Sequence, residues 1–112
     1  NAHGKLKVID VQALDISKIV NKYSFLKIDA EGSEGKIICR LNKTQLKQVD
    51  IICEISGKTN AKVIFNHCKK NSIHIFSQKI KWNLVKKLND IPHHHSDGLI
   101  FISSKKNILN FR

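Results

Sequence analysis

The sequence predicts an α/β fold with a mainly parallel sheet, built by one domain that spans residues 1–112. Short apolar runs rich in β-branched residues alternate along the chain with segments of helical periodicity. Strands that alternate with helices favour a parallel sheet, because each helix carries the chain back to the start of the next strand. The last two apolar runs, 72–77 and 99–103, lack a convincing crossover helix between them, which favours an antiparallel pair.

The first third of the chain contains one weak and one strong strand candidate. Residues 6–11 alternate apolar and polar side chains, which predicts a strand or an extended arm. Asp15 is placed to cap a short helix over residues 16–23. Residues 24–29 (SFLKID) predict a strong strand, and Gly32 permits the sharp turn that follows it.

The middle of the chain continues this alternation. Ser33 is expected to cap a helix over residues 34–46, in which the polar stretch 42–44 (NKT) is a candidate break. Residues 49–55 (VDIICEI) predict the second strong strand. After a turn at 57–60, the next helix is expected over residues 61–71.

The last third contains the remaining strands. Residues 72–77 (SIHIFS) and 99–103 (LIFIS) predict strands, whereas residues 79–89 fit a strand or a helix equally well. The loop between them, residues 91–98, contains the only proline, Pro92.

The net charge of +11 at pH 7 is typical of proteins that bind nucleic acid. Nearly all the basic residues are lysines, however, with Arg40 and Arg112 as the only arginines. Nucleic-acid readers usually carry arginines for bidentate contacts and exposed aromatic side chains for stacking, whereas four of the five phenylalanines here lie in apolar runs. A basic module that binds nucleic acid or an anionic glycan is therefore the alternative function.

The three cysteines, Cys39, Cys53 and Cys68, lie in hydrophobic stretches, and none belongs to a C-x-x-C pair. Such thiols are expected in the core of a reduced protein, which favours the cytoplasm. The sequence shows no signal peptide and no apolar run long enough to span a membrane. Asn1 and Ala2 are consistent with the remnant of a cleaved tag.

The most informative segment is FLKIDAEGSE, residues 25–34, which places three acidic residues around a strand-to-helix turn. Ligands of open α/β sheets bind beyond the carboxyl ends of the strands, where this turn is expected. The following strand is expected to bring a fourth carboxylate to the same edge. Neighbouring carboxylates raise one another's pKa or recruit a cation, and either property suits acid–base chemistry. The four residues are Asp29, Glu31, Glu34 and Glu54.

These acids differ in how readily a structural role explains them. Glu34 lies in the first turn of the expected helix, where the helix dipole favours a carboxylate, and Glu31 fits a solvated turn. Asp29 follows an apolar strand, so we expect it to be partly buried and to need an ion-pair partner. Lys27 lies on the same face of the strand and could be that partner. Asp29 is therefore the preferred functional residue.

The segment FLKIDAEGSE closely resembles the motif of FkbM-type methyltransferases, Ile/Leu-Lys-Ile-Asp-Val-Glu-Gly-Ala/Ser-Glu. Ala30 departs only in size, and the matching residues are Lys27, Ile28, Asp29, Glu31, Gly32 and Glu34. Upstream, Leu14 and Asp15 resemble the family's preceding Leu-Asp pair, and downstream IICEI, with Glu54, resembles its following strand. The resemblance covers roughly residues 8–104.

For the fold, the resemblance implies a Rossmann-like methyltransferase sheet with the spatial strand order 3-2-1-4-5-7-6 and an antiparallel strand 7. This chain would supply the carboxyl-terminal half, in the order 4-5-7-6. Strands 4 to 7 would be, in chain order, residues 24–29, 49–55, 72–77 and 99–103.

For the activity, the resemblance implies methyl transfer from S-adenosylmethionine to a hydroxyl group of a sugar or another small acceptor. Asp29 would be the base or the acceptor orienter, with Glu31 and Glu54 lining the site. The family's cofactor site is built by the preceding half of its sheet, and none of the five glycines here forms a cradling loop. The chain alone is therefore expected to bind no cofactor and to be inactive.

Without a preceding half, the strand at residues 24–29 would be an open sheet edge. An exposed apolar edge tends to pair with another chain. We therefore predict a homodimer through this edge, with residues 6–11 as a segment able to cover it.

The consecutive histidines His93, His94 and His95 make a poor metal site, because neighbouring residues of an extended chain point to opposite sides. A loop feature is the simpler interpretation, and the alternative is that one of them reaches the acceptor pocket. His67 and His74 lie in apolar contexts typical of satisfied core residues.

A third interpretation is a metal-dependent hydrolase that uses Asp29, Glu31 and Glu54. A bound divalent ion with oxygen ligands would favour it. The ordered motif matches favour the methyltransferase instead.

Overall fold

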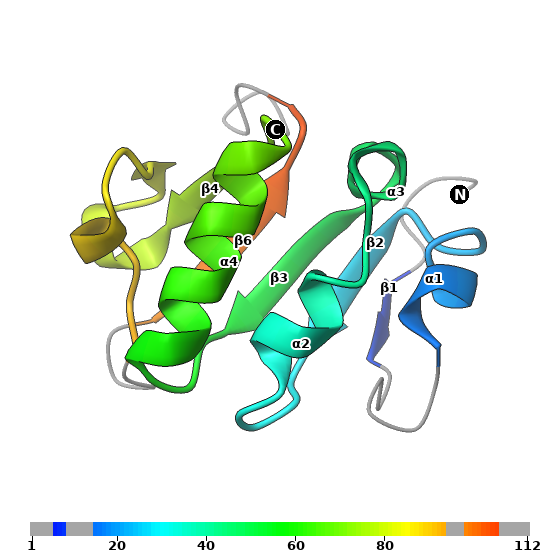
Figure 1. Ribbon diagram of the computed structural model, residues 1–112, viewed down its shortest axis with the longest axis horizontal. Coiled ribbons are helices and arrows are strands. Elements are labelled where there is room, and N and C mark those ends of the chain that lie inside the picture. The colour runs from blue at the N-terminus through cyan, green and yellow to red at the C-terminus, as the bar shows by residue number, and fades with distance from the viewer. Residues whose placement is uncertain (1–5, 9–14, 94–97, 106–112) are drawn as a thin grey trace.

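Six short strands form one mixed sheet in the order β1-β2-β3-β6-β4-β5 (Figure 1). The computed structural model describes residues 6–8, 15–93 and 98–105. β1, β2 and β3 are parallel, β6 is antiparallel to β3 and β4, and β5 is antiparallel to β4. The predicted α/β class is confirmed. The strands are β1 (Leu6–Val8), β2 (Phe25–Ile28), β3 (Asp50–Glu54), β4 (His74–Ser77), β5 (Asn83–Leu84) and β6 (Leu99–Ser103).

The connection from β3 to β4 leaves room for one strand between them, and β6 fills that position. Because β6 is antiparallel to both neighbours, β4 runs in the same direction as β2 and β3. The strands β2, β3 and β4 therefore end at one side of the sheet, where β6 begins. This side is called the carboxyl edge below.

Among the described residues, four α-helices and two 3-10 turns connect the strands. In Figure 1, α2 and α4 lie in front of the sheet and cross it side by side. The helices are α1 (Ile16–Ile19), α2 (Glu34–Ile38), α3 (Lys43–Gln48) and α4 (Lys58–Lys70), and the 3-10 turns are η1 (Gln78–Ile80) and η2 (Leu88–Asp90).

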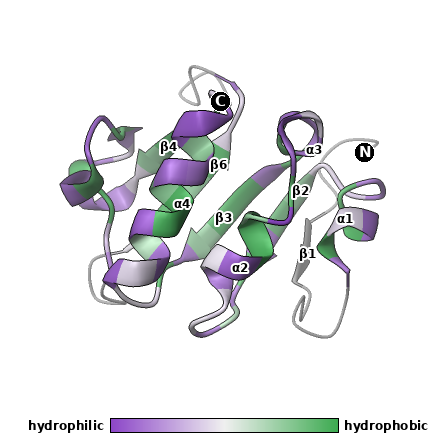
Figure 2. Ribbon diagram, in the orientation of Figure 1, coloured by the Kyte–Doolittle hydropathy of each residue, from purple (hydrophilic) through white to green (hydrophobic). Residues whose placement is uncertain are grey.

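The main core lies between the helices and one face of the sheet. Alternate residues of each central strand point into it, as the period of two requires. Figure 2 shows the central strands largely in the hydrophobic colour, whereas much of the visible side of α4 is hydrophilic. The strand residues of this core are Leu26, Ile28, Ile51, Cys53, Ile75, Ile100 and Ile102, and the helices add Ile16, Ile19, Ile37, Ile38, Leu46, Ala61, Ile64 and Cys68.

The other face of the sheet carries aromatic and charged side chains. The ring of Phe101 lies between those of Phe25 and Phe76, at centroid distances of 5.9 and 6.4 Å. Tilted aromatic pairs at these distances are mutually attractive. Lys27 and Asp29 alternate with the buried Leu26 and Ile28 and are exposed.

The edge of β2 is not open. β1 pairs with it in parallel, with Leu6 opposite Phe25 and Val8 opposite Lys27. The expectation of an exposed edge at residues 24–29 is therefore wrong, whereas the suggestion that residues 6–11 can cover this edge is confirmed for residues 6–8. A homodimer through that edge would have to displace β1, so the dimer stays a prediction without its original premise.

Helix boundaries differ from the prediction at two places. The helix expected over residues 34–46 is two helices, because Asn42 caps a new one: its side chain accepts a bond from the Gln45 N–H, and the Gln45 side chain accepts one from the Asn42 N–H. Ser33 occupies the N-cap position of α2, as predicted, but its side chain makes no cap bond. α4 begins at Lys58, inside the segment predicted as a turn.

Two burial predictions also need correction. Cys39 ends α2 and is exposed, so only Cys53 and Cys68 are core thiols. His67 and His74 are half-buried and not core residues. The Nε2 atom of His67 lies 2.7 Å from the carbonyl oxygen of Leu41, so this histidine is satisfied at the rim of the core.

Candidate functional site

Asp29 and Glu54 stand beside each other at the carboxyl edge. The parallel register pairs Ile28 of β2 with Cys53 of β3, and each acid is the next residue along its strand. Asp29 is exposed and Glu54 is half-buried. The convergence predicted for these two acids is therefore confirmed by the register.

Asp29 differs from the prediction in its surroundings. It is exposed and not partly buried, because β2 turns its odd-numbered residues away from the helix-covered face. Within the described ranges the only ion pair joins Lys105 to Asp50, so Lys27 is not an ion-pair partner of Asp29. A carboxylate in this position can accept a hydrogen bond from a ligand without first losing a protein partner.

Glu34, by contrast, is the buried acid of the motif, with an exposed fraction of 0%. Its Oε2 atom accepts a hydrogen bond from the Gly32 N–H at 2.7 Å, and its Oε1 atom accepts one from the Ser56 N–H at 3.0 Å. The Ser56 hydroxyl lies 3.4 Å from Oε2. The turn after β2 is thus bonded to the turn after β3 through one carboxylate.

Asn60 completes this connection from the first turn of α4. Its side-chain Nδ2 donates to the carbonyl oxygens of Gly32 and Ser56, at 3.1 and 2.8 Å, and its Oδ1 accepts from the Gly35 N–H at 2.9 Å. Together, Glu34 and Asn60 satisfy backbone groups of both turns that secondary structure leaves unpaired. We call these two side chains the clamp.

The clamp was not predicted from the sequence. Helix-dipole stabilisation was the role considered for Glu34, whereas two of its three hydrogen bonds come from Ser56, 22 residues away. Asn60 belongs to the segment predicted as a turn, residues 57–60, and Ser56 directly precedes that segment. The sequence did offer one signal. A polar residue that can bond backbone groups follows each strong strand: Glu34 after β2 and Asn60 after β3.

Glu31 is exposed in the turn between Asp29 and Glu34. Gly32 follows it with a φ of +99°, a conformation that favours glycine, and a Cβ atom there would meet nothing within 4 Å. The turn therefore projects Glu31 into solvent. The site thus consists of three accessible carboxylates, Asp29, Glu31 and Glu54, on a base built by the clamp.

The negative charge of this edge affects the neighbouring thiol. Burial raises the pKa of Cys53 well above its usual value, and the charges of three carboxylates raise it further: Glu34, Asp29 and Glu54. Burial, with a further contribution from Cys39, raises the pKa of Cys68 to about 12. Both thiols are therefore protonated at neutral pH and poor nucleophiles.

The connection between β4 and β6 reaches the same edge. The Gly57 N–H, just before α4, donates to the His93 carbonyl oxygen at 2.9 Å, and the Leu99 N–H donates to Gln78 Oε1 at 2.9 Å. His93 is half-buried beside the start of α4. His94 and His95 lie outside the described residues.

The described glycines do not fit a nucleotide-cofactor cradle. Gly32 and Gly57 have positive φ in open turns, Gly35 packs against Asn60 and Val63, and Gly98 lies against Gln78. Each is explained by local geometry, and no two of them line a common loop. No step of a mechanism is therefore assigned to a cofactor held by these residues.

The acids do not form a metal centre either. Among residues 6–8, 15–93 and 98–105, no group of three or more histidine, cysteine, aspartate or glutamate side chains could hold a metal ion. The Asp29, Glu31 and Glu54 arrangement suits hydrogen bonding and proton transfer instead.

Comparison of the chain with family models, curated proteins and solved structures found no match. Among the described residues, no helix is long and apolar enough to cross a membrane.

Proposed function

We propose that the chain is the carboxyl-terminal half of an S-adenosylmethionine-dependent methyltransferase that acts on a hydroxyl group of a sugar or another small acceptor. The proposal rests on the resemblance of FLKIDAEGSE and its flanks to FkbM-type enzymes. The observation that carries it is the strand arrangement. β2, β3, β6 and β4 lie in that order with β6 alone reversed, as the resemblance requires for strands 4-5-7-6.

Asp29 has the position that an acceptor base needs. It is exposed at the carboxyl edge, next to Glu54, and the neighbouring backbone is held by the clamp. S-adenosylmethionine, when bound by the complete enzyme, would supply the methyl group by cleavage of its methyl–sulfur bond, which leaves S-adenosylhomocysteine. The acceptor hydroxyl donates a hydrogen bond to Asp29, and its proton passes to this carboxylate as the oxygen becomes bonded to the methyl carbon.

Glu31 and Glu54 extend the acceptor site on either side of Asp29. As hydrogen-bond acceptors, they suit a ligand with several hydroxyl groups, which donate to carboxylate oxygens. This supports a sugar over an acceptor with one hydroxyl group. The described residues provide this acceptor side only.

Calorimetric titration of S-adenosylhomocysteine tests whether the cofactor site lies outside this chain, in the other half of the enzyme. We expect no heat of binding with this 112-residue chain and clear binding with the complete parent enzyme. Binding by the chain alone would show that it builds a cofactor pocket of its own. A complete parent that does not bind would remove the methyltransferase proposal.

The role of Asp29 has a separate test. In the complete parent, Asp29→Asn should lower kcat by roughly a hundredfold or more, since general-base contributions are typically of that size. The affinity for S-adenosylhomocysteine should not change, because Asp29 acts on the acceptor. Normal turnover of this variant would contradict the assignment.

The alternative of a basic binding module has one observation in its favour. α4 exposes four lysines, which are not among the described ion pairs: Lys58, Lys62, Lys69 and Lys70. Against it, Phe76 and Phe101 are buried and unable to stack on bases. The three free thiols are consistent with a reducing compartment, so the cytoplasm is the proposed location.

A further inference from the structure

A cavity of about 290 Å³ opens beside the start of α4, close to the carboxyl edge. This volume is at the lower end of the range for small-molecule pockets. Its described lining is Lys58, Ala61, Leu88, Asn89 and His93. The wall on one side is therefore the first turn of α4, and the wall on the other is η2 with the residues that follow it.

The lining combines an apolar surface with polar groups. Leu88 is 39% exposed, one of two large hydrophobic side chains with such exposure among the described residues, and Ala61 behind it is buried. Lys58 and Asn89 are exposed and add an ammonium group and an amide. An apolar patch next to a few placed polar groups is the usual composition of a ligand pocket.

The charge around the cavity is positive. The Lys79 ammonium donates to the Asn89 carbonyl oxygen at 2.9 Å, which brings a second cation next to Lys58's cavity. Asp90, the residue that follows Asn89, uses its carboxylate to accept the N–H groups of Lys86 and Lys87. An anionic ligand group that enters here meets the ammonium group of Lys58, whereas Asp90 is not part of the described lining.

The position relates the cavity to the proposed acceptor site. Only three residues separate Glu54 from Lys58, so their Cα atoms are at most about 14 Å apart. The Gly57–His93 backbone bond joins the two walls at this point. One acceptor molecule of moderate size can therefore reach from the carboxylates to the cavity.

We propose that this cavity binds the acidic group of the acceptor, which makes the acceptor a hydroxylated carboxylic acid of the uronic-acid class. The inference rests on the proposed function. The ligand carboxylate pairs with Lys58, the amide of Asn89 bonds its hydroxyl groups, and Leu88 contacts the apolar side of its ring. Its reacting hydroxyl group extends towards Glu54 and Asp29.

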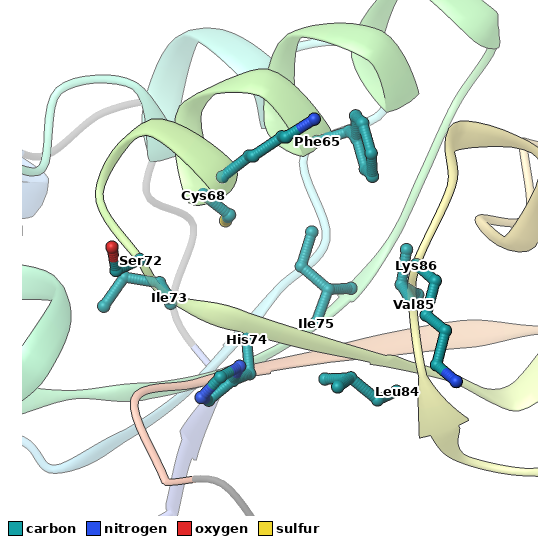
Figure 3. Close-up of a pocket in the computed structure, with 10 residues that line it drawn as sticks. Phe65, Cys68, Ser72, Ile73, His74, Ile75, Leu84, Val85 and Lys86 are labelled. Atoms are coloured by element: carbon teal, nitrogen blue, oxygen red, sulfur yellow. The ribbon is translucent and has the colours of Figure 1, made fainter.

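A second cavity serves as the internal control. It has a volume of about 250 Å³ and lies at the other end of α4, between that helix, β4 and the segment after β5 (Figure 3). Its core is apolar, with Phe65, Cys68, Ile73 and Ile75. Lys69 places its ammonium 5.8 Å from the centroid of the Phe65 ring, and Figure 3 shows the amino group of Lys86 directed away from Cys68.

The test is amide NMR of this chain titrated with D-glucuronate, and in parallel with neutral D-glucose. Glucuronate should shift the signals of Lys58, Ala61, Leu88 and Asn89, with a Kd at least fivefold lower than that of glucose. Lys58→Gln should raise the glucuronate Kd at least fivefold, Lys58→Arg should stay within twofold, and the control Lys69→Gln should also stay within twofold. The same spectra report whether each variant is folded.

Shifts spread evenly over the lysine surface, shifts centred on the Phe65 cavity, or equal affinity for glucose and glucuronate would overturn the proposal. So would equal effects of Lys58→Gln and Lys69→Gln. The titration needs no cofactor, so its outcome is independent of S-adenosylhomocysteine binding by the parent. If the chain binds glucuronate at this cavity but the parent binds no S-adenosylhomocysteine, the anion site is supported and the methyltransferase proposal is contradicted.

Discussion

Two carboxylates in this chain, Glu34 and Asp90, close turns in the same way, by accepting backbone N–H groups. Glu34 is fully buried and joins segments 22 residues apart, whereas Asp90 is partly exposed and bonds Lys86 and Lys87, within four residues. In water such bonds compete with solvent, but in the interior an unmade bond leaves a donor unpaired. The comparison indicates that burial, more than the number of hydrogen bonds, decides how much each acid contributes to the stability of the fold.

The largest expected effect is from Glu34→Gln. The amide places a donor where Gly32 or Ser56 presents an N–H, so the buried charge-assisted bonds are lost and one donor stays unpaired. We expect a loss of about 3 kcal/mol in the free energy of unfolding, measured by urea denaturation.

Glu31→Gln is the matched control, because Glu31 lies exposed in the same turn. Its free energy of unfolding should stay within about 0.5 kcal/mol of the parent chain. Equal effects at the two positions would contradict the distinction between buried and exposed acids.

A somewhat smaller effect is expected from Asn60→Ala. This change removes neutral hydrogen bonds to Gly32, Gly35 and Ser56 and leaves their backbone groups to be solvated. We expect a loss of about 2 kcal/mol in the same denaturation measurement. Because Asn60 and Glu34 share partners, the double variant should lose less than the sum of the single losses. Strict additivity would show that the clamp is not one unit.

Thiol labelling reports on the same region from inside the core. Exposed Cys39 should react first with a thiol reagent at pH 8, while burial and nearby negative charge keep Cys53 protonated and slow. In Glu34→Gln, more frequent local opening of the core should increase the rate of Cys53 labelling by roughly a hundredfold. Mass spectrometry measures this rate. Asp90→Asn should leave that rate unchanged. Faster Cys53 labelling in Asp90→Asn but not in Glu34→Gln would contradict the larger structural role of Glu34.

The smallest effect is expected from Asp90→Asn, and it depends on pH. The backbone bond from Lys86, with that from Lys87, lowers the pKa of Asp90 below its ordinary value of 3.8. A lowered pKa in the folded state means that the stabilisation is present at neutral pH and is lost as the pH falls through the folded pKa. The difference in stability between the parent chain and this variant should therefore disappear in acid. A difference that grows below pH 3.8 would contradict this sign.

The fold was largely predictable because its strands are local apolar runs. Residues 99–103 form β6 with the predicted bounds, and the strands at 24–29 and 49–55 differ only at their ends. Their period of two also places Lys27 and Asp29 on one face. The weaker segment 79–89 could not be assigned, because its two 3-10 turns and the two-residue strand β5 have no apolar periodicity.

The sequence by itself determined where the strong strands lie, that the last strand runs antiparallel, and that Asp29 and Glu54 meet at one edge. Only the tertiary structure decided which acid of FLKIDAEGSE is buried. Helix packing covers one face of the sheet, so Glu34 is enclosed and Asp29 is left exposed. The partners of Glu34 and the walls of the Lys58 cavity come from segments distant in the chain, and local sequence patterns carry no record of such contacts.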